Sequence, residues 1–341
     1  MKQSSSKRHP TMIDVANLAG VSQTTVSFVV NNISGLAIPQ ETRERVRAAV
    51  KQLGYRPNAA AQLLRTSKSH VIGFITDQVD STPFSGEFIT GAQGAAWTHQ
   101  KLLLMVNTGG KPAIEEEAIE LMLERRVEGI IYAAMIQQLV TPPANLWEVP
   151  AVLLNCFCAD RSLPSVVPDE VRGGCVATEA LLRKGHRRVA FINGPAGWPP
   201  TDGRLAGYRQ ALEALDLTVD ESLVRHGNGF ADSGYAHTMD VMGLPNPPTA
   251  IFCATDRMAM GAYDALKELG LSIPGNVAVM GYDNQELIGA YLRPSLSTMA
   301  LPFFGMGQWA VSYLIHYERH AGQHAPVQHL IECPFIERES I

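Results

Sequence analysis

Residues 14–32 read DVANLAGVSQTTVSFVVNN and predict two short helices separated by a tight turn. Gly20 ends the first helix, and Ser22 can cap the second, in which Val26 and Val29 mark a buried face. Small residues at such a turn let two helices approach closely, as a helix-turn-helix requires. Polar side chains at the start of the second helix can then reach base edges in the major groove of DNA.

A third helix is predicted to begin at Pro39 and to end at Gly54. Its basic side chains are suited to contacts with phosphates: Arg43, Arg45, Arg47 and Lys51. A basic helix taken alone is equally typical of a solvated surface. Together with the helix-turn-helix, however, it favours DNA binding.

The charge of the chain is divided between its two parts. Residues 1–70 carry ten Lys or Arg and three Asp or Glu, for a net charge of +7, whereas the other 271 of the 341 residues carry 18 and 30, for −12. The overall charge of −5 therefore conceals a small basic head on an acidic body. This division suggests a polyanionic partner for the head alone.

From Val71 onward, short apolar runs alternate with helical stretches. The runs predict buried parallel strands at 71–76, 102–107, 129–134, 151–157, 188–194, 223–227, 250–255 and 277–283. The helices are expected at 84–100, 112–126, 202–215, 231–242 and 256–270. Two such series of similar length imply two doubly wound α/β subdomains, and a ligand is expected in the cleft between them.

The chain resembles the lactose-repressor (LacI/GalR) family of transcriptional regulators. The resemblance is carried by residues 14–32, by TRERVRAAVKQLGYRPNAAAQLL at 42–64, and by four segments of the body: GHRRVAFING, GRLAGYRQAL, ATDRMAMGAYDALKELGLSIPGNVAVMGYDN and PSLSTM. It implies a helix-turn-helix domain at 1–56, a hinge helix and linker at 57–70, and an effector-binding and dimerisation domain at 71–341 with the periplasmic-binding-protein fold. Its N-subdomain would comprise about 71–167 and 301–325, and its C-subdomain about 168–298 and 327–341.

The resemblance also implies the residues that bind DNA. Base reading falls to Gln23, Thr24 and Phe28, and backbone contact falls to Ser22, Thr25, Ser27 and Asn31. Phe28 stands where the family usually has Arg or Tyr, so it either contacts thymine methyls or simply packs. In the hinge, Ala61 lets two helices approach in the minor groove, and Leu64 wedges between base pairs and bends the duplex. An ordinary apolar linker residue is the alternative for Leu64.

Arg204 and Asp283 are the expected centre of an effector site, since each follows or ends a strand at the cleft. A guanidinium offers a planar fork to hydroxyls, and a carboxylate accepts bonds from them. The resemblance adds further positions, with Thr255 favoured over Asp256 as the partner of Asp283: Asp77, Phe84, Asn155, Trp198, Phe230, Thr255, Asp256 and Phe303. Each has a structural alternative as a cap, a core residue or an ion-pair partner.

Carboxylates, an Arg and aromatic faces together predict a small carbohydrate as the effector, with a nucleobase or other non-sugar corepressor as the alternative. The expected protein is a DNA-binding repressor, a homodimer on a palindromic operator. Two other classes compete, a sugar-binding module without DNA and a nucleotide-using enzyme. The intact head opposes the first, and the lack of a phosphate loop or a nucleophile motif opposes the second.

No cofactor or metal is expected, and the histidines at 316, 320 and 324 are interpreted as a solvated helix face. The five cysteines are expected to be free thiols in a reducing cytoplasm: Cys156, Cys158, Cys175, Cys253 and Cys333. The N-terminus lacks the apolar region of a signal peptide, and no apolar run is long enough to span a membrane.

Overall fold

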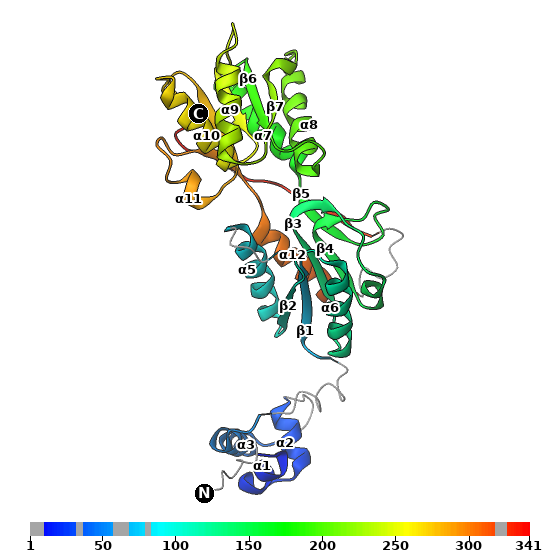
Figure 1. Cartoon of the computed structure of the whole chain (residues 1–341). Coiled ribbons are helices and arrows are strands. Elements are labelled where there is room, and N and C mark those ends of the chain that lie inside the picture. Colours follow the sequence, from blue (N-terminus) through cyan, green and yellow to red (C-terminus); the bar gives the residue numbers. More distant parts are fainter. Residues whose placement is uncertain (1–9, 32–36, 57–67, 79–82, 318–325) are drawn as a thin grey trace, which may run out of the picture. The chain divides into compact units, whose positions relative to one another are not determined.

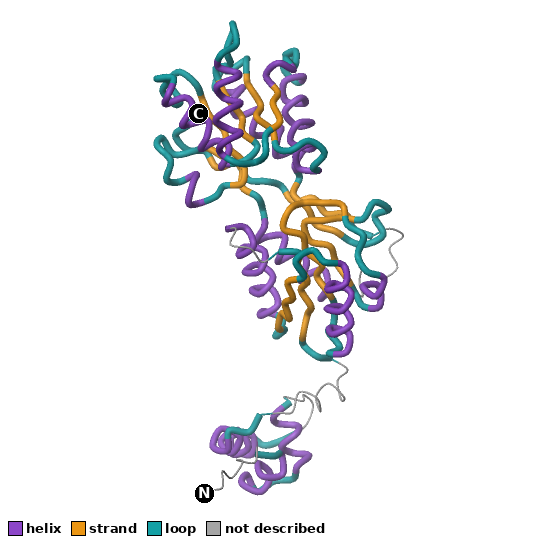
Figure 2. Tube along the Cα trace, viewed as in Figure 1, coloured by secondary structure: helices purple, strands orange, loops and turns teal. Residues whose placement is uncertain are grey.

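A computed structural model describes residues 10–31, 37–56, 68–78, 83–317 and 326–341, although nothing is described of the side chains of 83–85. The chain forms two compact units, Met1–Ser69 and His70–Ile341. Figure 1 follows the chain by residue number, and Figure 2 shows that the described elements of the first unit are all helical.

The first unit, the head, contains α1 (Met12–Ala19), α2 (Gln23–Val30) and α3 (Gln40–Leu53). Thr11 and Asp14 form a reciprocal capping box at the start of α1, and Gly20 ends that helix with a φ of 64°, in the left-handed region that glycine tolerates. The three helices bury one small core: Val15, Ala16, Ala19, Val26, Val29, Val46, Ala49 and Tyr55. This core holds α2 in place and leaves its other face to solvent.

The N-subdomain of the body is built on a parallel sheet with the order β11-β5-β4-β3-β1-β2. Its strands are β1 (Val71–Thr76), β2 (Leu102–Asn107), β3 (Ile130–Leu139), β4 (Ala151–Phe157), β5 (Ser165–Pro168) and β11 (Gln328–Ile331). Helices α5 (Pro83–Thr98) and α12 (Phe303–Ile315) pack on one face of this sheet, and α6 (Pro112–Glu124) packs on the other. A short 3₁₀ helix at Ala144–Glu148 precedes β4.

The C-subdomain repeats the plan with the order β12-β10-β9-β8-β6-β7. Its strands are β6 (Val189–Asn193), β7 (Val224–His226), β8 (Ala250–Cys253), β9 (Ala278–Asp283), β10 (Ser297–Ala300) and the antiparallel β12 (Phe335–Ile336). Its helices are α7 (Glu170–Arg183), α8 (Pro199–Glu213), α9 (Ala231–Met242), α10 (Asp256–Glu268) and α11 (Glu286–Gly289), with a 3₁₀ turn at Glu221–Leu223. Helices α7 and α8 cover one face of the sheet, and α9 and α10 cover the other.

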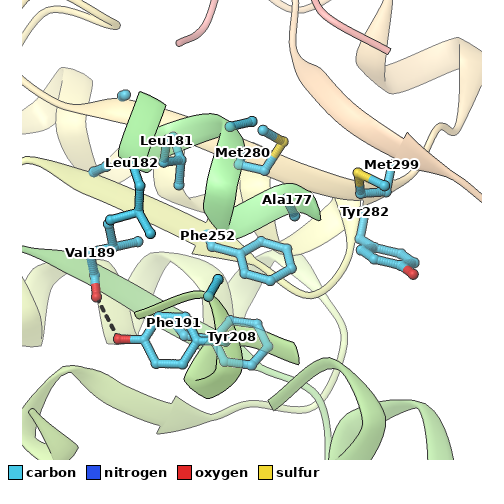
Figure 3. Packing of buried hydrophobic residues seen from close by; sticks show 14 of the residues in the cluster. Ala177, Leu181, Leu182, Val189, Phe191, Tyr208, Phe252, Met280, Tyr282 and Met299 are labelled. Atoms are coloured by element: carbon cyan, nitrogen blue, oxygen red, sulfur yellow. Dashed lines mark hydrogen bonds between the residues drawn. The ribbon is translucent and has the colours of Figure 1, made fainter. Parts of the chain in front are cut away.

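The core under α7 and α8 is aromatic. The rings of Phe191 and Phe252 stack with centroids 4.5 Å apart, and Tyr208 stacks on Phe191 at 5.3 Å. Figure 3 shows these rings in one layer, with the hydroxyl of Tyr208 donating to the carbonyl of Val189. The same layer ends at Tyr282 on β9, which brings the core to the edge of the sheet where the candidate site lies.

One expected boundary was wrong. Residues 327–341 were assigned to the C-subdomain, but β11 pairs in parallel with β5 in the sheet of the N-subdomain. Strand β5 would otherwise be an edge strand, and β11 supplies partners for its backbone groups. The chain then crosses to the C-subdomain after Ile331, where it forms β12.

Three chain segments therefore connect the subdomains, and the third is hydrogen-bonded to the other two. The amide of Asp169, in the first crossing, donates to the carbonyl of Ile331 at 2.8 Å. The amide of Ala300, in the second, donates to the carbonyl of Pro334 at 2.7 Å. The crossings thus form one hydrogen-bonded connection rather than three separate linkers.

Among the described residues, no single helix is long and apolar enough to cross a membrane; only α1 and α2 counted together, bent by 103°, reach that length and composition.

Candidate functional site

Helix α2 presents polar residues at its first turn. The hydroxyl of Ser22 caps the helix by accepting from the amide of Thr25 at 3.1 Å, and the two hydroxyl groups lie 2.9 Å apart. The side chains of Gln23 and Thr24 are exposed beside this cap. The leading turn of the second helix of the helix-turn-helix is therefore accessible, as major-groove reading requires.

The other residues predicted for DNA contact lie further along α2. Asn31 follows the helix and donates to the carbonyl of Ser27 at 2.7 Å. Phe28 is half-buried, and the core cluster of described head residues does not include it. The two residues predicted for the hinge, Ala61 and Leu64, lie outside the described residues.

A cavity of about 160 Å³ lies between the two subdomains of the body. Both subdomains contribute to its walls, and so do Pro168 and Leu301 at two of the crossings. Its other lining residues are Met135, Ile136, Gln137, Asn155, Glu170, Gly194, Pro195, Trp198, Pro200, Thr201, Arg204, Gly229, Ala254, Thr255, Asp283 and Phe303. Six of the ten predicted effector residues are thus brought together: Asn155, Trp198, Arg204, Thr255, Asp283 and Phe303.

Arg204 is held by a carboxylate that the sequence interpretation missed. Its Nε and Nη2 donate to the two oxygens of Glu170 at 2.8 and 3.0 Å, and its Nη1 donates to the carbonyl of Ala254 at 2.5 Å. The guanidinium carbon also lies 3.7 Å from the centre of the Tyr282 ring. Burial alone would lower the pKa of Arg204, but the Glu170 carboxylate raises it above its ordinary value. The guanidinium therefore stays charged, and each of its three nitrogens already donates one hydrogen bond.

Asp283 ends β9 at the cavity wall with a φ of 107°. Its Oδ1 lies 4.0 Å from Nη1 of Arg204, too far for a hydrogen bond, and its Oδ2 accepts from the side-chain amide of Gln285 at 3.3 Å. Burial raises the pKa of Asp283 well above its usual range, and the opposing effect of Arg204 does not cancel this. The carboxyl group therefore ionises less readily than an exposed aspartate, and a further donor or cation beside it would favour its charged form.

A bulge in β3 forms the wall contributed by the N-subdomain. The pairing of β3 with β4 shifts between Ala133 and Gln138, so the residues between them leave the regular ladder and line the cavity. Asp77 holds this bulge in place, because it accepts from the amide of Met135 at 2.9 Å and from Nε2 of Gln138 at 3.0 Å. Asp77 is absent from the described lining of the cavity, so it supports the wall and does not form it.

Asn155 faces this bulge from β4 with a φ of 57°, a conformation that Asn tolerates better than most residues. Its Nδ2 donates to the carbonyls of Ala134 and Met135 at 3.1 and 3.2 Å, which fixes the orientation of the amide. The remaining Oδ1 is buried, with no hydrogen-bond partner among the described residues. An acceptor is thus left available in the lining.

The predicted aromatic surfaces divide into two groups. Trp198 is 42% exposed at the start of α8, and the buried Phe303 lies 4.2 Å from Phe88 between ring centroids; both line the cavity. Phe230 is 55% exposed and does not belong to the described lining, where Gly229 stands instead. The side chain of Phe84 lies outside the described part of the chain.

Of the two alternatives on α10, the structure places Thr255 in the lining and Asp256 outside it. The hydroxyl of Thr255 caps α10 and donates to the carbonyl of Gly229 at 3.0 Å. Asp256 is fully buried, and it accepts from the amide of Gln285 and from the hydroxyl of Thr298, both at 2.6 Å. Since both oxygens bind the protein itself, the expectation of Asp256 as a ligand contact is not met.

No group of three or more His, Cys, Asp or Glu side chains that could hold a metal occurs among the described residues. His320 and His324 of the interpreted helix face lie outside them.

Comparison with known families agrees with this architecture. Residues 11–58 match the model of bacterial regulatory proteins of the lacI family, and residues 178–341 match a periplasmic binding protein-like domain. The chain is 31% identical over 310 residues to the ribose operon repressor of Escherichia coli K12, covering 90% of this chain and 92% of that protein. It is 32% identical over 307 residues to the transcriptional repressor PurR of Vibrio atlanticus, covering 89% and 91%.

Two solved structures extend the comparison. The lac repressor dimer bound to operator and the anti-inducer ONPF is 28% identical, with a TM-score of 0.75 over 98% of this chain and 99% of that one. The complex of the transcriptional regulator CelR with cellobiose is 27% identical, with a TM-score of 0.66 over 97% and 100%. These relatives are repressors and regulators rather than enzymes. The chain belongs to the LacI family of bacterial regulatory proteins, and it is a DNA-binding transcriptional repressor.

Proposed function

We propose that this repressor binds a palindromic operator as a homodimer in the cytoplasm, and that a small carbohydrate in the inter-subdomain cavity controls its affinity for that operator. The observation that carries the choice of a carbohydrate is the chemistry of the wall. Asp283 and the unpartnered Oδ1 of Asn155 offer acceptors, while the partly exposed Trp198 offers an aromatic surface. Hydroxyl groups donate to such acceptors, and the C–H face of a sugar stacks on such a ring.

The control of DNA binding follows from the position of the cavity. A ligand there contacts both subdomains, so its affinity depends on the angle between them. If that angle differs between the DNA-bound and the free dimer, the ligand changes operator affinity by the ratio of its own affinities for the two states. In a dimer on a two-fold operator, a change of this kind alters the spacing of the two heads, and with it their fit to successive major grooves.

The residues proposed to contact DNA are those of α2 and its flanks, Ser22, Gln23, Thr24, Thr25, Ser27, Phe28 and Asn31, together with Ala61 and Leu64 in the hinge segment. Exposure of Gln23 and Thr24 beside the Ser22 cap supports this set. Gln can bond bidentately to adenine, and the methyl group of Thr or the ring of Phe can contact the methyl group of thymine.

The test combines ligand binding with DNA binding. A thermal-shift screen of the full chain against pentoses, hexoses, disaccharides and nucleobases should show stabilisation by a sugar, and the same sugar should change the affinity for a palindromic operator measured by gel shift. Asp283→Asn should weaken this response, whereas Asp264→Asn, at an exposed position on α10, should leave it unchanged. Stabilisation by a nucleobase and by none of the sugars would refute the carbohydrate proposal, and absence of operator binding at low salt would refute the DNA-binding one.

A further inference from the structure

The charges of the cavity lining do not cancel. The described lining contains three acidic or basic side chains, those of Glu170, Arg204 and Asp283. Glu170 uses both of its oxygens on Arg204, so these two form a closed, neutral pair. Oδ1 of Asp283 lies 4.0 Å from the same guanidinium, at the outer limit of an ion pair, so the two carboxyl groups of the described lining share one cation.

The hydrogen-bonding groups show the same imbalance. The three nitrogens of Arg204 already donate to Glu170 and to the carbonyl of Ala254. By contrast, two side-chain oxygens of lining residues, Oδ1 of Asn155 and Oε1 of Gln137, are buried and unpartnered among the described residues. Exchanging the oxygen and nitrogen of the Asn155 amide would not satisfy the group, because its nitrogen already donates to two carbonyls. Two buried acceptors of the lining are thus available to donors of a ligand.

Outside the described lining, one carboxylate of each subdomain lies near the other. Glu87 stands on α5 of the N-subdomain and Glu286 on α11 of the C-subdomain. Burial and the nearby charge of Glu286 raise the pKa of Glu87 above its ordinary value, so the two groups are close enough to repel each other. Their shared field is attractive to a cation and repulsive to an anion.

The charges on neighbouring elements do not remove this imbalance. Arg338 donates to Oδ1 of Asn284 at 2.7 Å and offsets the buried charge of Asp256, and Arg257 donates to Oε1 of Gln285 at 3.2 Å. Neither arginine belongs to the described lining. Asp256 adds a further negative charge near Asp283.

We propose that the cavity binds a polyhydroxylated ligand that carries a protonated amino group, in chemical terms an amino sugar, with its ammonium group on Asp283 and its hydroxyl groups on Asn155 and Gln137. This inference rests on the proposed carbohydrate effector and narrows its class. An ammonium group supplies both a donor and a second positive charge for the two carboxyl groups, and it lets the buried Asp283 ionise without leaving a net charge. A phosphorylated or carboxylated sugar would instead add a second anion beside Asp283.

The experiment compares matched sugars on the full chain by isothermal titration calorimetry at pH 7. The probes are glucosamine, galactosamine and mannosamine, each with its parent hexose, which is neutral and of similar size, and its N-acetyl derivative, which keeps the nitrogen but loses the charge and adds an acetyl group. The best amino sugar should bind on the order of ten- to a hundredfold more tightly than its parent, the range expected for one charge-assisted hydrogen bond. N-acetylation should abolish this advantage.

Two variants test the assignment of the charge. Asp283→Asn should bring the amino sugar and its parent to similar affinities, because it removes the carboxylate. Glu170→Gln should also reduce the preference, since Arg204 would then neutralise Asp283. Asp264→Asn, on the exposed surface of α10, should keep the preference unchanged. If the Glu170 variant does not fold, the comparison of sugars on the wild-type chain and the Asp283 variant decide the matter.

The possible results separate the two proposals. A parent hexose that binds as tightly as its amino derivative, or a preference that survives Asp283→Asn, overturns the amino-sugar inference and leaves the carbohydrate effector standing. Tight binding of a sugar phosphate or a sugar acid has the same meaning. Binding of a nucleobase and of none of the sugars overturns both proposals.

Discussion

The buried pair of Glu170 and Arg204 allows a quantitative prediction. Arg204→Met removes the cation but leaves Glu170 in a site where its carboxyl group is 6% exposed, and it also removes the contact with the ring of Tyr282. Removing one partner of a buried ion pair typically costs about 3–5 kcal/mol, because the remaining charge has neither water nor a counter-ion. For a domain of this size, each kcal/mol corresponds to roughly 2–4 °C, so we expect the melting temperature of the body to fall by about 10 °C.

A double-mutant cycle isolates the pair. Glu170→Gln alone should cost an amount similar to that of Arg204→Met, but the double variant should cost clearly less than the sum, with a coupling of about 2–3 kcal/mol. The assay is thermal unfolding of the full chain at pH 7, followed by circular dichroism, with Asp264→Asn as the surface control. Two single variants that each cost less than about 1 kcal/mol and add in the double variant would refute the reasoning. Such a result would mean that the guanidinium is solvated in the protein and does not depend on Glu170.

Four further predictions concern the wall, the buried acid and the DNA contacts. Asp77→Ala should weaken effector binding about tenfold, because the β3 bulge loses two hydrogen bonds, while operator affinity without effector stays unchanged; calorimetry with an unaltered dissociation constant would contradict this. Burial raises the pKa of Asp256 to about 7, above its value near 4 in the unfolded chain, so ionisation should destabilise the protein as pH rises through this window, by up to about 4 kcal/mol. Urea unfolding at pH 5 and 7.5 should show that Asp256→Asn reduces this dependence, with Asp283 and Glu87 as the source of the remainder, and an identical slope in the variant would exclude a contribution of Asp256. Operator affinity should fall steeply with salt, as for ~6–10 phosphate contacts, whereas a flat gel-shift series would refute the role of the basic head. Leu64→Ala should weaken binding to operator more than binding to random DNA, and an equal loss would rule out a wedge between base pairs.

Much of the fold could be predicted because buried parallel strands have a clear signature. The apolar runs at 71–76 and 102–107 coincide with β1 and β2, and the cap and stop residues of the head lie at its helix ends. Strand β11 carries no such signature. Its four residues, QHLI, alternate weakly, and Leu330 is 56% exposed, so nothing in the sequence indicates which sheet it joins. Only its pairing with β5 decides this.

The site was predicted less completely, for a physical reason. Arg204 and Asp283 were found because the ends of parallel strands meet at one edge of a sheet. Glu170 was missed because an acid at the first position of a helix usually serves the helix dipole, and its partner lies 34 residues away. Asp77 and Asp256 were expected to contact a ligand, but each accepts from one backbone amide and one side chain of the protein instead. A sequence does not distinguish an acid that supports a wall from one that forms it.

The hydrogen-bonded connection between the subdomains has a mechanical consequence. Because the third crossing is hydrogen-bonded to the other two, sliding of the subdomains past each other would break backbone hydrogen bonds, and we expect rotation about an axis through the crossings instead. The cavity lies against that axis, because Pro168 and Leu301 belong to its lining. Strand β1 is six residues, or about 20 Å, long, and its first residue marks the point where the chain enters the body. Over the length of β1, a rotation of about 10° moves the start of the strand by about 3–4 Å. A rotation set by a ligand in the cavity would therefore reach the far end of β1 as a displacement of this size.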